Sequence, residues 1–279
     1  MKNYKLGLYE KAMPITLTWK EKFFAAKEAG FDYVEISIDE SDEKLSRLNW
    51  SNDEIKLILD ASHMLGIPLG SMCLSAHRKY PLGSMCEQTR KMSLEIMEKA
   101  CILCENLGIR YIQLAGYDVY YEDSTAETVE FFKTNLLKCT EIAAKYGILL
   151  GFETMETPFM NTVEKSLEYI NLVNSPYLNI YPDIGNLNNA ALLYNQPVVE
   201  DINKGKGRFI AAHIKETKPG NYRDVPFSDG VVNFEELVTA CWNNGIRRFV
   251  VEMWYTGKND WKDDLAFASQ LVSNILSKI

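Results

Sequence analysis

Short runs of apolar and β-branched residues recur along the chain, and longer stretches with apolar residues at helical spacing separate them. The short runs predict β-strands and the longer stretches predict amphipathic α-helices. The predicted strands cover residues 5–10, 33–39, 69–76, 111–116, 149–155, 178–184, 209–216 and 248–254. The helical pattern is clearest at residues 19–30, 52–66 and 93–108.

A glycine closes several of the predicted helices, just before the next apolar run. The phrases AGFDYVEI, LGIPLGSM, LGIRYIQL, YGILLGFE and NGIRRFVVE repeat the order helix, glycine, strand. Glycine fits a helix end because the left-handed conformation found there costs little without a Cβ atom. Eight such units favour a closed (β/α)8 barrel, which typically needs about 250 residues. No GxGxxG follows the first strand and no Pro-, Gly- or Ser-rich linker divides the chain, so we predict one barrel domain over residues 1–279.

Composition narrows the class of protein. The 279 residues are 47% hydrophobic, and 38 acidic residues exceed 30 basic ones, giving a formal net charge of −8. An acidic surface repels a phosphate backbone, which argues against general nucleic-acid binding. No apolar run approaches the ~20 residues that cross a bilayer, and the first residues lack a secretion signal. We therefore expect a cytoplasmic protein without a membrane partner.

The six cysteines show no disulfide framework and fit reduced cytosolic thiols. Cys101 and Cys104 form a CxxC, but they lie inside a predicted helix that runs from Cys86 to Leu107. No second CxxC accompanies them, and their helical spacing is typical of core residues. We expect both thiols to fill the core and not to bind metal.

Four metal-competent residues stand near the ends of the last four predicted strands. They are Glu153, Asp183, His213 and Glu252. Their sequence gaps of 30, 30 and 39 residues each correspond to about one strand-helix unit, so each strand delivers one side chain. Singly, each residue would be an ordinary polar group at a strand end. Four in register predict a site for one divalent ion (Zn2+, Mn2+, Co2+ or Mg2+) at the active-site end of the barrel.

The chain also resembles a known family. The similarity is carried by the segments LGLYEKAMP, SMCLSAHRKYPLGS, GFETMETPFMNT, YPDIGNL, HIKETKPGNYRDVPFSDGVVNF and VEMW. These segments resemble the sugar-phosphate 3-epimerases of the xylose-isomerase-like barrels, which act on L-ribulose 5-phosphate or L-xylulose 5-phosphate in L-ascorbate and pentose breakdown. The loop segments are more specific than the fold, because a shared substrate would constrain them.

The resemblance implies a reaction and roles for the four residues. Epimerisation at C3 removes the proton beside the C2 carbonyl, gives an enediolate that the metal stabilises, and returns a proton to the other face. The strand-5 and strand-8 glutamates, Glu153 and Glu252, would exchange the protons and also bind the ion. Asp183 and His213 would only hold the ion. Which glutamate begins depends on the direction of the reaction, and the sequence does not decide it.

Six further residues are candidates for contacts with a sugar phosphate. Glu156 is a candidate for a sugar hydroxyl, and Asn186 is either a substrate contact or a helix cap. Arg223 and Lys218 lie in the long loop after the seventh strand, where phosphate sites of this fold are common. His77 and Arg78, after the third strand, are the other phosphate candidates. A plain surface or structural role is the alternative for each of them.

Residues at other strand ends complete the prediction. Tyr9 and Glu10 end the first strand and are candidates for the wall of the pocket. Trp254 and Tyr255 follow Glu252 and supply either a lid or ordinary packing. His63 lies in the last turn of a helix, away from the active-site end, and we expect a structural role for it.

Other functions remain open at this stage. A non-phosphorylated ketose 3-epimerase would use the same four ligands, and only the basic loop residues distinguish it. An apurinic-site endonuclease would need more histidines than the three present. A two-metal aldose–ketose isomerase would need a second ligand group, and a sugar sensor would not need acid–base glutamates. Related barrels often pair, so a homodimer is expected.

Overall fold

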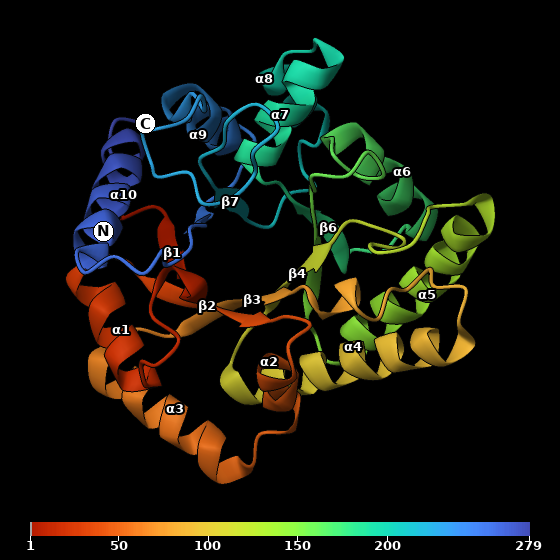
Figure 1. The fold of residues 1–279 in the computed structure, drawn as a ribbon, viewed down its shortest axis with the longest axis horizontal. Helices are drawn as coiled ribbons and strands as arrows, with labels where there is room; N and C mark the ends of the chain where they lie inside the picture. Colours follow the sequence, from red (N-terminus) through yellow and green to blue (C-terminus); the bar gives the residue numbers. More distant parts are fainter. Residues whose placement is uncertain (1) are drawn as a thin grey trace.

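The computed structural model describes residues 2–279 and contains eight parallel strands that surround a common axis (Figure 1). The strands are β1 (Lys5–Tyr9), β2 (Tyr33–Ile38), β3 (Leu69–Leu74), β4 (Tyr111–Ala115), β5 (Leu149–Glu153), β6 (Leu178–Tyr181), β7 (Ala212–Ile214) and β8 (Arg248–Val251). Their order in the sheet is β6-β5-β4-β3-β2-β1-β8-β7. All eight predicted strands are present, and the predicted (β/α)8 fold is confirmed.

The barrel closes between β6 and β7 through few bonds. The backbone N–H of Ile210 donates to the carbonyl of Ile180 at 3.1 Å, and that of His213 donates to the carbonyl of Pro182 at 2.9 Å. Both strands are shorter than predicted. Pro182 has no N–H to donate to a ladder, and Asp183 already caps the next helix, so β6 ends at Tyr181. Asp183 therefore stands just beyond β6. Glu252 also lies outside its strand, because β8 ends at Val251.

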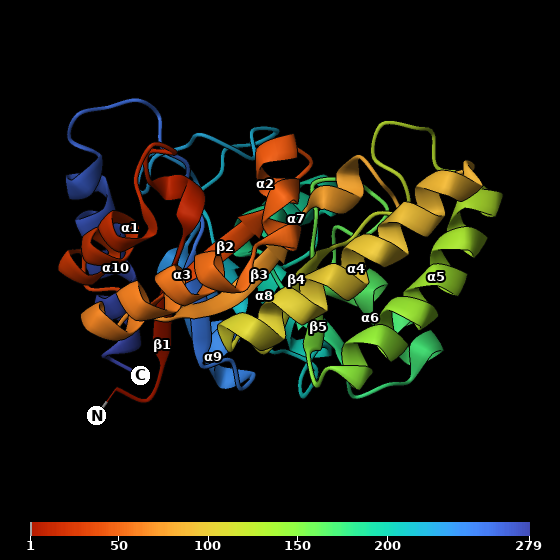
Figure 2. The same cartoon turned by 90° about the horizontal axis from the view of Figure 1, so that it is seen from below.

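Helices surround the strands, as Figures 1 and 2 show. The α-helices are α1 (Trp19–Glu28), α2 (Asp42–Ser46), α3 (Asn52–Leu65), α4 (Glu87–Leu107), α5 (Ala126–Lys145), α6 (Val163–Val173), α7 (Ile184–Tyr194), α8 (Val198–Lys204), α9 (Phe234–Asn243) and α10 (Trp261–Leu276). Three 3-10 turns are η1 (Glu10–Ala12), η2 (Arg47–Asn49) and η3 (Ala76–Arg78). In Figure 2 the loops that follow the strands gather on the upper side, and both chain ends lie below.

A tyrosine ring fills the interior of the barrel below the candidate site. Tyr33 is buried, and its hydroxyl donates at 3.1 Å to the carbonyl of Phe249 on β8, which is separated from β2 by β1 alone. A Cβ atom at Gly7 or at Gly70 would lie 2.4 Å from this ring. The two neighbouring strands therefore carry glycine where the ring passes.

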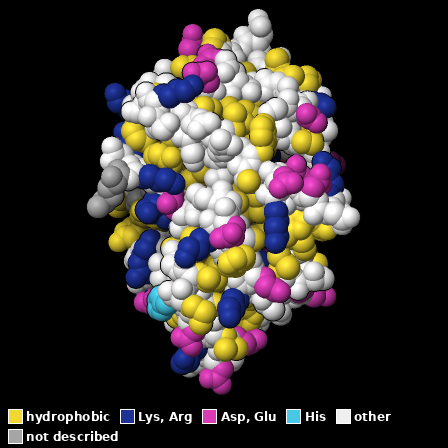
Figure 3. Space-filling view, turned by 90° about the vertical axis from the view of Figure 1, so that its left-hand side faces the viewer, with side chains coloured by type: hydrophobic (Ala, Val, Ile, Leu, Met, Phe, Trp, Pro, Cys, Tyr) yellow, Lys and Arg dark blue, Asp and Glu magenta, His cyan; other side chains and the backbone are white. Residues whose placement is uncertain are grey.

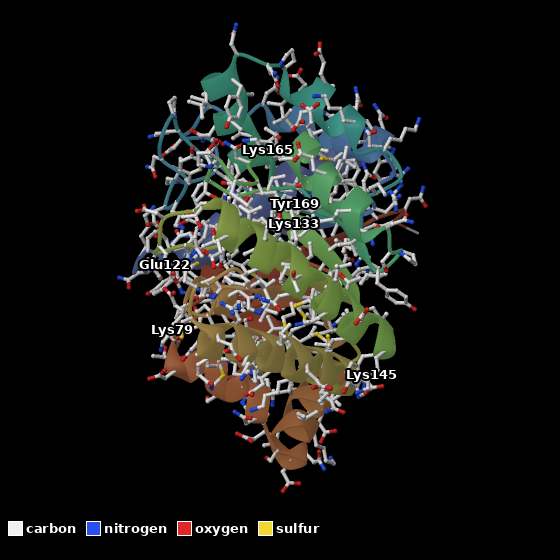
Figure 4. The ribbon with its side chains drawn as sticks, turned by 90° about the vertical axis from the view of Figure 1, so that its right-hand side faces the viewer. Lys79, Glu122, Lys133, Lys145, Lys165 and Tyr169 are labelled. Carbon is white, nitrogen blue, oxygen red and sulfur yellow. The ribbon has the colours of Figure 1, made fainter. Side chains whose placement is uncertain are left out.

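The outer helices pack through apolar faces. On the side of α4, α5 and α6, Tyr169 lies on α6 and Lys133 and Lys145 lie on α5 (Figure 4). The Tyr169 ring packs edge-on against Phe132 of α5, at 5.3 Å between centroids. This contact joins α5 to α6, and Phe152 of β5 lies 6.2 and 6.3 Å from the same two rings and so links both helices to the sheet.

The CxxC of α4 belongs to the core, as the sequence predicts. Cys101 and Cys104 are both completely buried inside α4. Burial raises the pKa of the Cys101 thiol to about 12, so the thiol stays protonated at neutral pH. Neither belongs to the candidate metal cluster.

Glu10 does not have the position that the sequence predicts for it. Its carboxylate turns away from the cavity into a buried cluster with Lys22, Lys44 and Arg47. Burial alone would raise its pKa, but the three cations outweigh burial and lower the pKa to about 2. The carboxylate also accepts the N–H of Ser37 at 3.1 Å. Glu10 thus fixes β1, α1 and α2 together and does not wall the pocket.

One face of the molecule carries basic and acidic side chains side by side. Figure 3 shows lysines and arginines interspersed with acidic residues over the face that carries α1, α3 and α10. Within residues 2–279, none of the helices has the length and apolarity needed to cross a membrane. His63 lies in the last turn of α3 on the surface, as predicted.

Candidate active site

The four predicted metal ligands converge. One ligand atom from each of Glu153, Asp183, His213 and Glu252 lies within 4.8 Å of the others, and all four residues are buried. Nδ1 of His213 is 3.2 Å from Oε1 of Glu153 and 3.3 Å from Oε2 of Glu252. The register of β5 to β8 therefore brings one side chain from each strand or strand end to a single point.

Local structure fixes Asp183 at the start of α7. Its Oδ1 accepts the N–H of Asn186 at 2.9 Å and so caps the helix. Its own N–H donates to Oγ1 of Thr154 at 3.0 Å. The cap engages one carboxylate oxygen and leaves Oδ2 pointing toward the cluster.

Glu35 is a part of the site that the sequence analysis missed. Its Oε1 lies 2.7 Å from Nε2 of His213, on the side of the ring opposite the cluster. Hydroxyl groups of Ser71 and Tyr181 donate to its Oε2 at 2.6 and 2.8 Å. An acceptor at Nε2 orients the ring and leaves Nδ1 to face the cluster. The available signal was a glutamate in the middle of the apolar strand β2, where burial is costly without a partner.

A lysine was missed as well. Lys215 follows His213 by two residues, so both side chains point to the same side of the chain. Its Nζ lies 2.6 Å from Oδ2 of Asp183 and 3.3 Å from Oε2 of Glu252. The side chain is buried and lies 5.9 Å from the centre of the Trp254 ring. Its spacing from His213 was the signal in the sequence.

Burial and charge set the proton affinities of the cluster. Burial, with repulsion from Glu252, raises the pKa of Glu153. Burial opposes ionisation of Glu252 too, but Lys215 and His213 outweigh it and hold the pKa of Glu252 well below its usual range. Burial alone would lower the pKa of His213, and the adjacent Glu35 and Glu252 raise it well above its usual value. The cluster thus stabilises positive charge strongly.

These residues fit a divalent ion. Three carboxylates and one imidazole are the donor set that Mn2+, Zn2+, Co2+ or Mg2+ accepts. Oδ2 of Asp183 and Oε2 of Glu252 are buried and lie 2.6 and 3.3 Å from Nζ of Lys215, and among residues 2–279 neither oxygen has a hydrogen bond of good geometry. Buried oxygens of this kind are satisfied by a cation. Gln113 donates to the other oxygen of Glu153 and fixes that side chain from β4.

The cavity above the cluster divides the four residues into two pairs. Glu153 and Glu252 are among the residues that line it, whereas Asp183 and His213 lie beneath and are completely buried. Only the two glutamates of the cluster therefore face a bound small molecule directly.

Four of the six predicted substrate residues line this cavity: Glu156, Asn186, Arg78 and Arg223. Glu156 accepts the hydroxyl of Tyr120 at 2.9 Å and pairs with Arg223 at 3.6 Å. Asn186 is not the cap of α7, which is Asp183; its amide donates to the carbonyl of Thr154 at 2.7 Å. These four side chains therefore lie at the cavity above the cluster, and their contact with a substrate stays a prediction.

The structure does not bring the other two candidates to the cavity. Lys218 lies exposed in a turn, where its backbone pairs with Asn221. His77 is buried against α4, with Nε2 3.0 Å from the carbonyl of Ser93. Burial lowers the pKa of His77 to about 4, so the ring is neutral at pH 7 and carries no charge for a phosphate.

Tyr9 and Trp254 line the cavity as predicted, and Tyr255 borders a neighbouring groove. Trp254 packs edge-on against Tyr9, at 6.2 Å between ring centroids. Lys215 lines the same cavity as Tyr9 and Trp254. The two aromatic rings therefore form one part of the cavity wall.

A buried carboxylate holds the loop that carries Arg223. Oε1 of Glu216 accepts the backbone N–H groups of Thr217 and Val232, each at 3.0 Å. A Cβ atom at Gly230 would lie 2.2 Å from this oxygen, so only glycine allows the loop to close over Glu216. The loop after β7 is therefore held at both ends beside the cavity.

Fold and site together define the class: a (β/α)8 barrel with a buried, four-residue, metal-competent cluster at the upper end of its strands. The family model described as xylose isomerase-like TIM barrel matches residues 23–271. The chain belongs to this family, as its loop segments predicted.

One related protein and two solved structures are similar to the chain over nearly its whole length. The chain is 41% identical over 278 residues to the L-ribulose-5-phosphate 3-epimerase UlaE of Escherichia coli O157:H7, covering 99% of this chain and 96% of that protein. Two solved structures share the fold. A D-tagatose 3-epimerase-like protein has a TM-score of 0.80 at 20% identity, covering 98% of this chain and 97% of that one. The D-psicose 3-epimerase of Clostridium cellulolyticum H10 with D-tagatose has a TM-score of 0.81 at 16% identity, covering 98% and 99%.

The Glu35–His213 contact predicts a measurable effect on metal affinity. Replacing Glu35 by Gln removes the carboxylate that orients the ring, so we expect the affinity for Mn2+ to fall about 10- to 100-fold. Isothermal titration of the metal-free protein measures it. Glu28→Gln, at an exposed position of α1, is the matched control and leaves the affinity unchanged. An affinity of Glu35→Gln within twofold of wild type would contradict the assignment.

Proposed function

We propose that the protein is a metal-dependent 3-epimerase that interconverts L-ribulose 5-phosphate and L-xylulose 5-phosphate, in L-ascorbate and pentose breakdown. One observation carries the proposal: of the four clustered residues, only Glu153 and Glu252 line the cavity, and they approach it from two non-adjacent strand ends. This is the arrangement that proton removal and return at one carbon require. The 41% identity to a protein named L-ribulose-5-phosphate 3-epimerase supports the substrate.

Each side chain then has a task. Asp183 and His213 would hold the ion together with the two glutamates, and a bound divalent ion would supply Lewis-acid chemistry to the reaction. Glu153 and Glu252 take the proton from C3 and return one on the other face. Gln113 holds Glu153 in place through its amide. Tyr9 and Trp254 exclude water from the reacting carbon.

Arg78 is the best-placed group for the phosphate. Its guanidinium lines the cavity and stacks 4.6 Å from the centre of the Tyr120 ring, and its buried Nε has no hydrogen-bond partner within residues 2–279. Arg223 also lines the cavity, but it is 46% exposed and already pairs with Glu156. An arginine without a carboxylate partner binds a phosphate in bidentate fashion without breaking an existing pair.

The proposal extends to the whole chain. We propose that residues 1–279 form one catalytic domain that acts in the cytoplasm as a homodimer. The unbroken repeat of strand and helix supports the single domain, and the free cysteines fit a reducing compartment. The resemblance to barrels that often pair supports the homodimer.

Proton exchange at C3 tests the reaction. In D2O, the metal-loaded protein should convert L-ribulose 5-phosphate to L-xylulose 5-phosphate and introduce deuterium at C3, which proton NMR detects. Glu153→Gln and Glu252→Gln should each lower the rate about 10²- to 10⁴-fold, the usual contribution of a general acid or base. Both variants are titrated with Mn2+ to separate this loss from loss of the ion.

Glu141→Gln, at an exposed position of α5, is the control and keeps the wild-type rate. The epimerase proposal fails if wild type produces neither C3 deuterium nor L-xylulose 5-phosphate. The assignment of the two glutamates fails if the Gln variants bind Mn2+ and turn over at the wild-type rate.

Substitution of Arg78 by Met tests phosphate recognition. We expect kcat/KM for L-ribulose 5-phosphate to fall about 10- to 100-fold, because a charge-assisted contact is lost. Activity on unphosphorylated L-ribulose should change less than about threefold. Lys79→Met, the adjacent exposed residue, is the control. An equal loss on both sugars would contradict a phosphate role, and wild-type preference for L-ribulose would favour a non-phosphorylated ketose 3-epimerase.

A further inference from the structure

We propose that Lys215 is a catalytic residue, whose ammonium donates a hydrogen bond to the ketose oxygen that gains negative charge as the C3 proton leaves. The inference rests on the proposed function and adds a residue to it. Lys215 is placed by β7 beside the cluster, on the same side as His213. It lines the cavity together with Glu153 and Glu252.

Two residues of the candidate metal cluster hold Lys215 in place. In the described part of the chain, its salt bridges go to Asp183, at 2.6 Å, and to Glu252, at 3.3 Å. Both oxygens belong to the proposed metal set. A sugar oxygen that binds beside these two carboxylates therefore lies within reach of the same ammonium. Binding of a cation by the carboxylates weakens their hold on Lys215 and frees its donors for the sugar.

A comparison within the chain separates this lysine from a structural one. Lys22 is also buried and pairs with Glu10 at 3.6 Å, but that cluster contains no proposed metal ligand and joins helices to the barrel. Lys215 brings a buried positive charge to a site that is meant to bind a cation. The desolvation of an ammonium is costly, and its proximity opposes metal binding. A role of the Lys215 ammonium in the reaction explains why a lysine occupies this position despite that cost.

The electron balance of the reaction gives Lys215 its task. A glutamate takes the C3 proton, the C3–H electron pair forms the C2–C3 double bond, and the carbonyl π pair moves to O2. Negative charge develops on that oxygen, and a fixed donor in a dry site stabilises it. The ammonium keeps its proton throughout, and the second glutamate returns a proton to C3. The Trp254 ring, 5.9 Å from Nζ, shields the ammonium from water.

The test compares Lys215→Met, Lys215→Arg and the matched control Lys22→Met, each assayed as the metal-loaded holoenzyme with L-ribulose 5-phosphate. We expect Lys215→Met to lower kcat about 10²- to 10³-fold, with KM within about threefold of wild type. Lys215→Arg keeps a charged donor and should stay within about tenfold of wild type. Lys22→Met should lower the melting temperature and keep kcat.

Metal binding supplies the second readout. Removing a neighbouring positive charge should leave the Mn2+ dissociation constant of metal-free Lys215→Met equal to wild type or lower. A dissociation constant raised more than about tenfold would overturn the inference, because Lys215 would then only position the ligands. Wild-type kcat in Lys215→Met would overturn it as well. Inactivity of wild type on L-ribulose 5-phosphate would instead overturn the proposed function, so the two failures are distinct.

Discussion

The buried imidazole of His213 is the contact on which the site depends. One ring nitrogen lies 2.7 Å from Glu35, and the other lies between Glu153 and Glu252. Carboxylates at this depth repel one another and cannot all ionise without nearby positive charge. Without an ion, His213 and Lys215 supply that charge. A bound divalent ion would replace the proton of the imidazole, because a histidine that ligates a metal is neutral, and Lys215 would keep its charge. Charge balance therefore links the oriented histidine, the lysine and the metal site.

The barrel supplies the geometry for this balance. Parallel strands deliver side chains from β2, β5, β7 and β8 at the same end, and the helix cap at Asp183 fixes one carboxylate oxygen and leaves the other free. Glu153 and Glu252 face the cavity while Asp183 and His213 lie beneath. The same cluster can thus bind an ion from below and exchange protons with a sugar above.

The sequence was sufficient to predict the eight strands and the convergence of Glu153, Asp183, His213 and Glu252, because both follow from the strand repeat. It could not predict that Glu10 turns into a cluster with Lys22, Lys44 and Arg47, since partners distant in sequence decide its orientation. The burial of His77 depends in the same way on packing against α4. The roles of Glu35 and Lys215 could not be predicted either, because their partners His213 and Asp183 lie far away in the sequence and meet them only in the fold. Both carry a charge that burial would penalise without a partner.

The most direct test of the account is the position and number of metal ions in the protein. Crystals grown with Mn2+ and measured for anomalous scattering locate each ion independently of activity. The account predicts one ion, bonded to Glu153, Asp183, His213 and Glu252 together. An ion bound elsewhere with these four residues empty, or a second ion held in the same cavity by other residues, would contradict it.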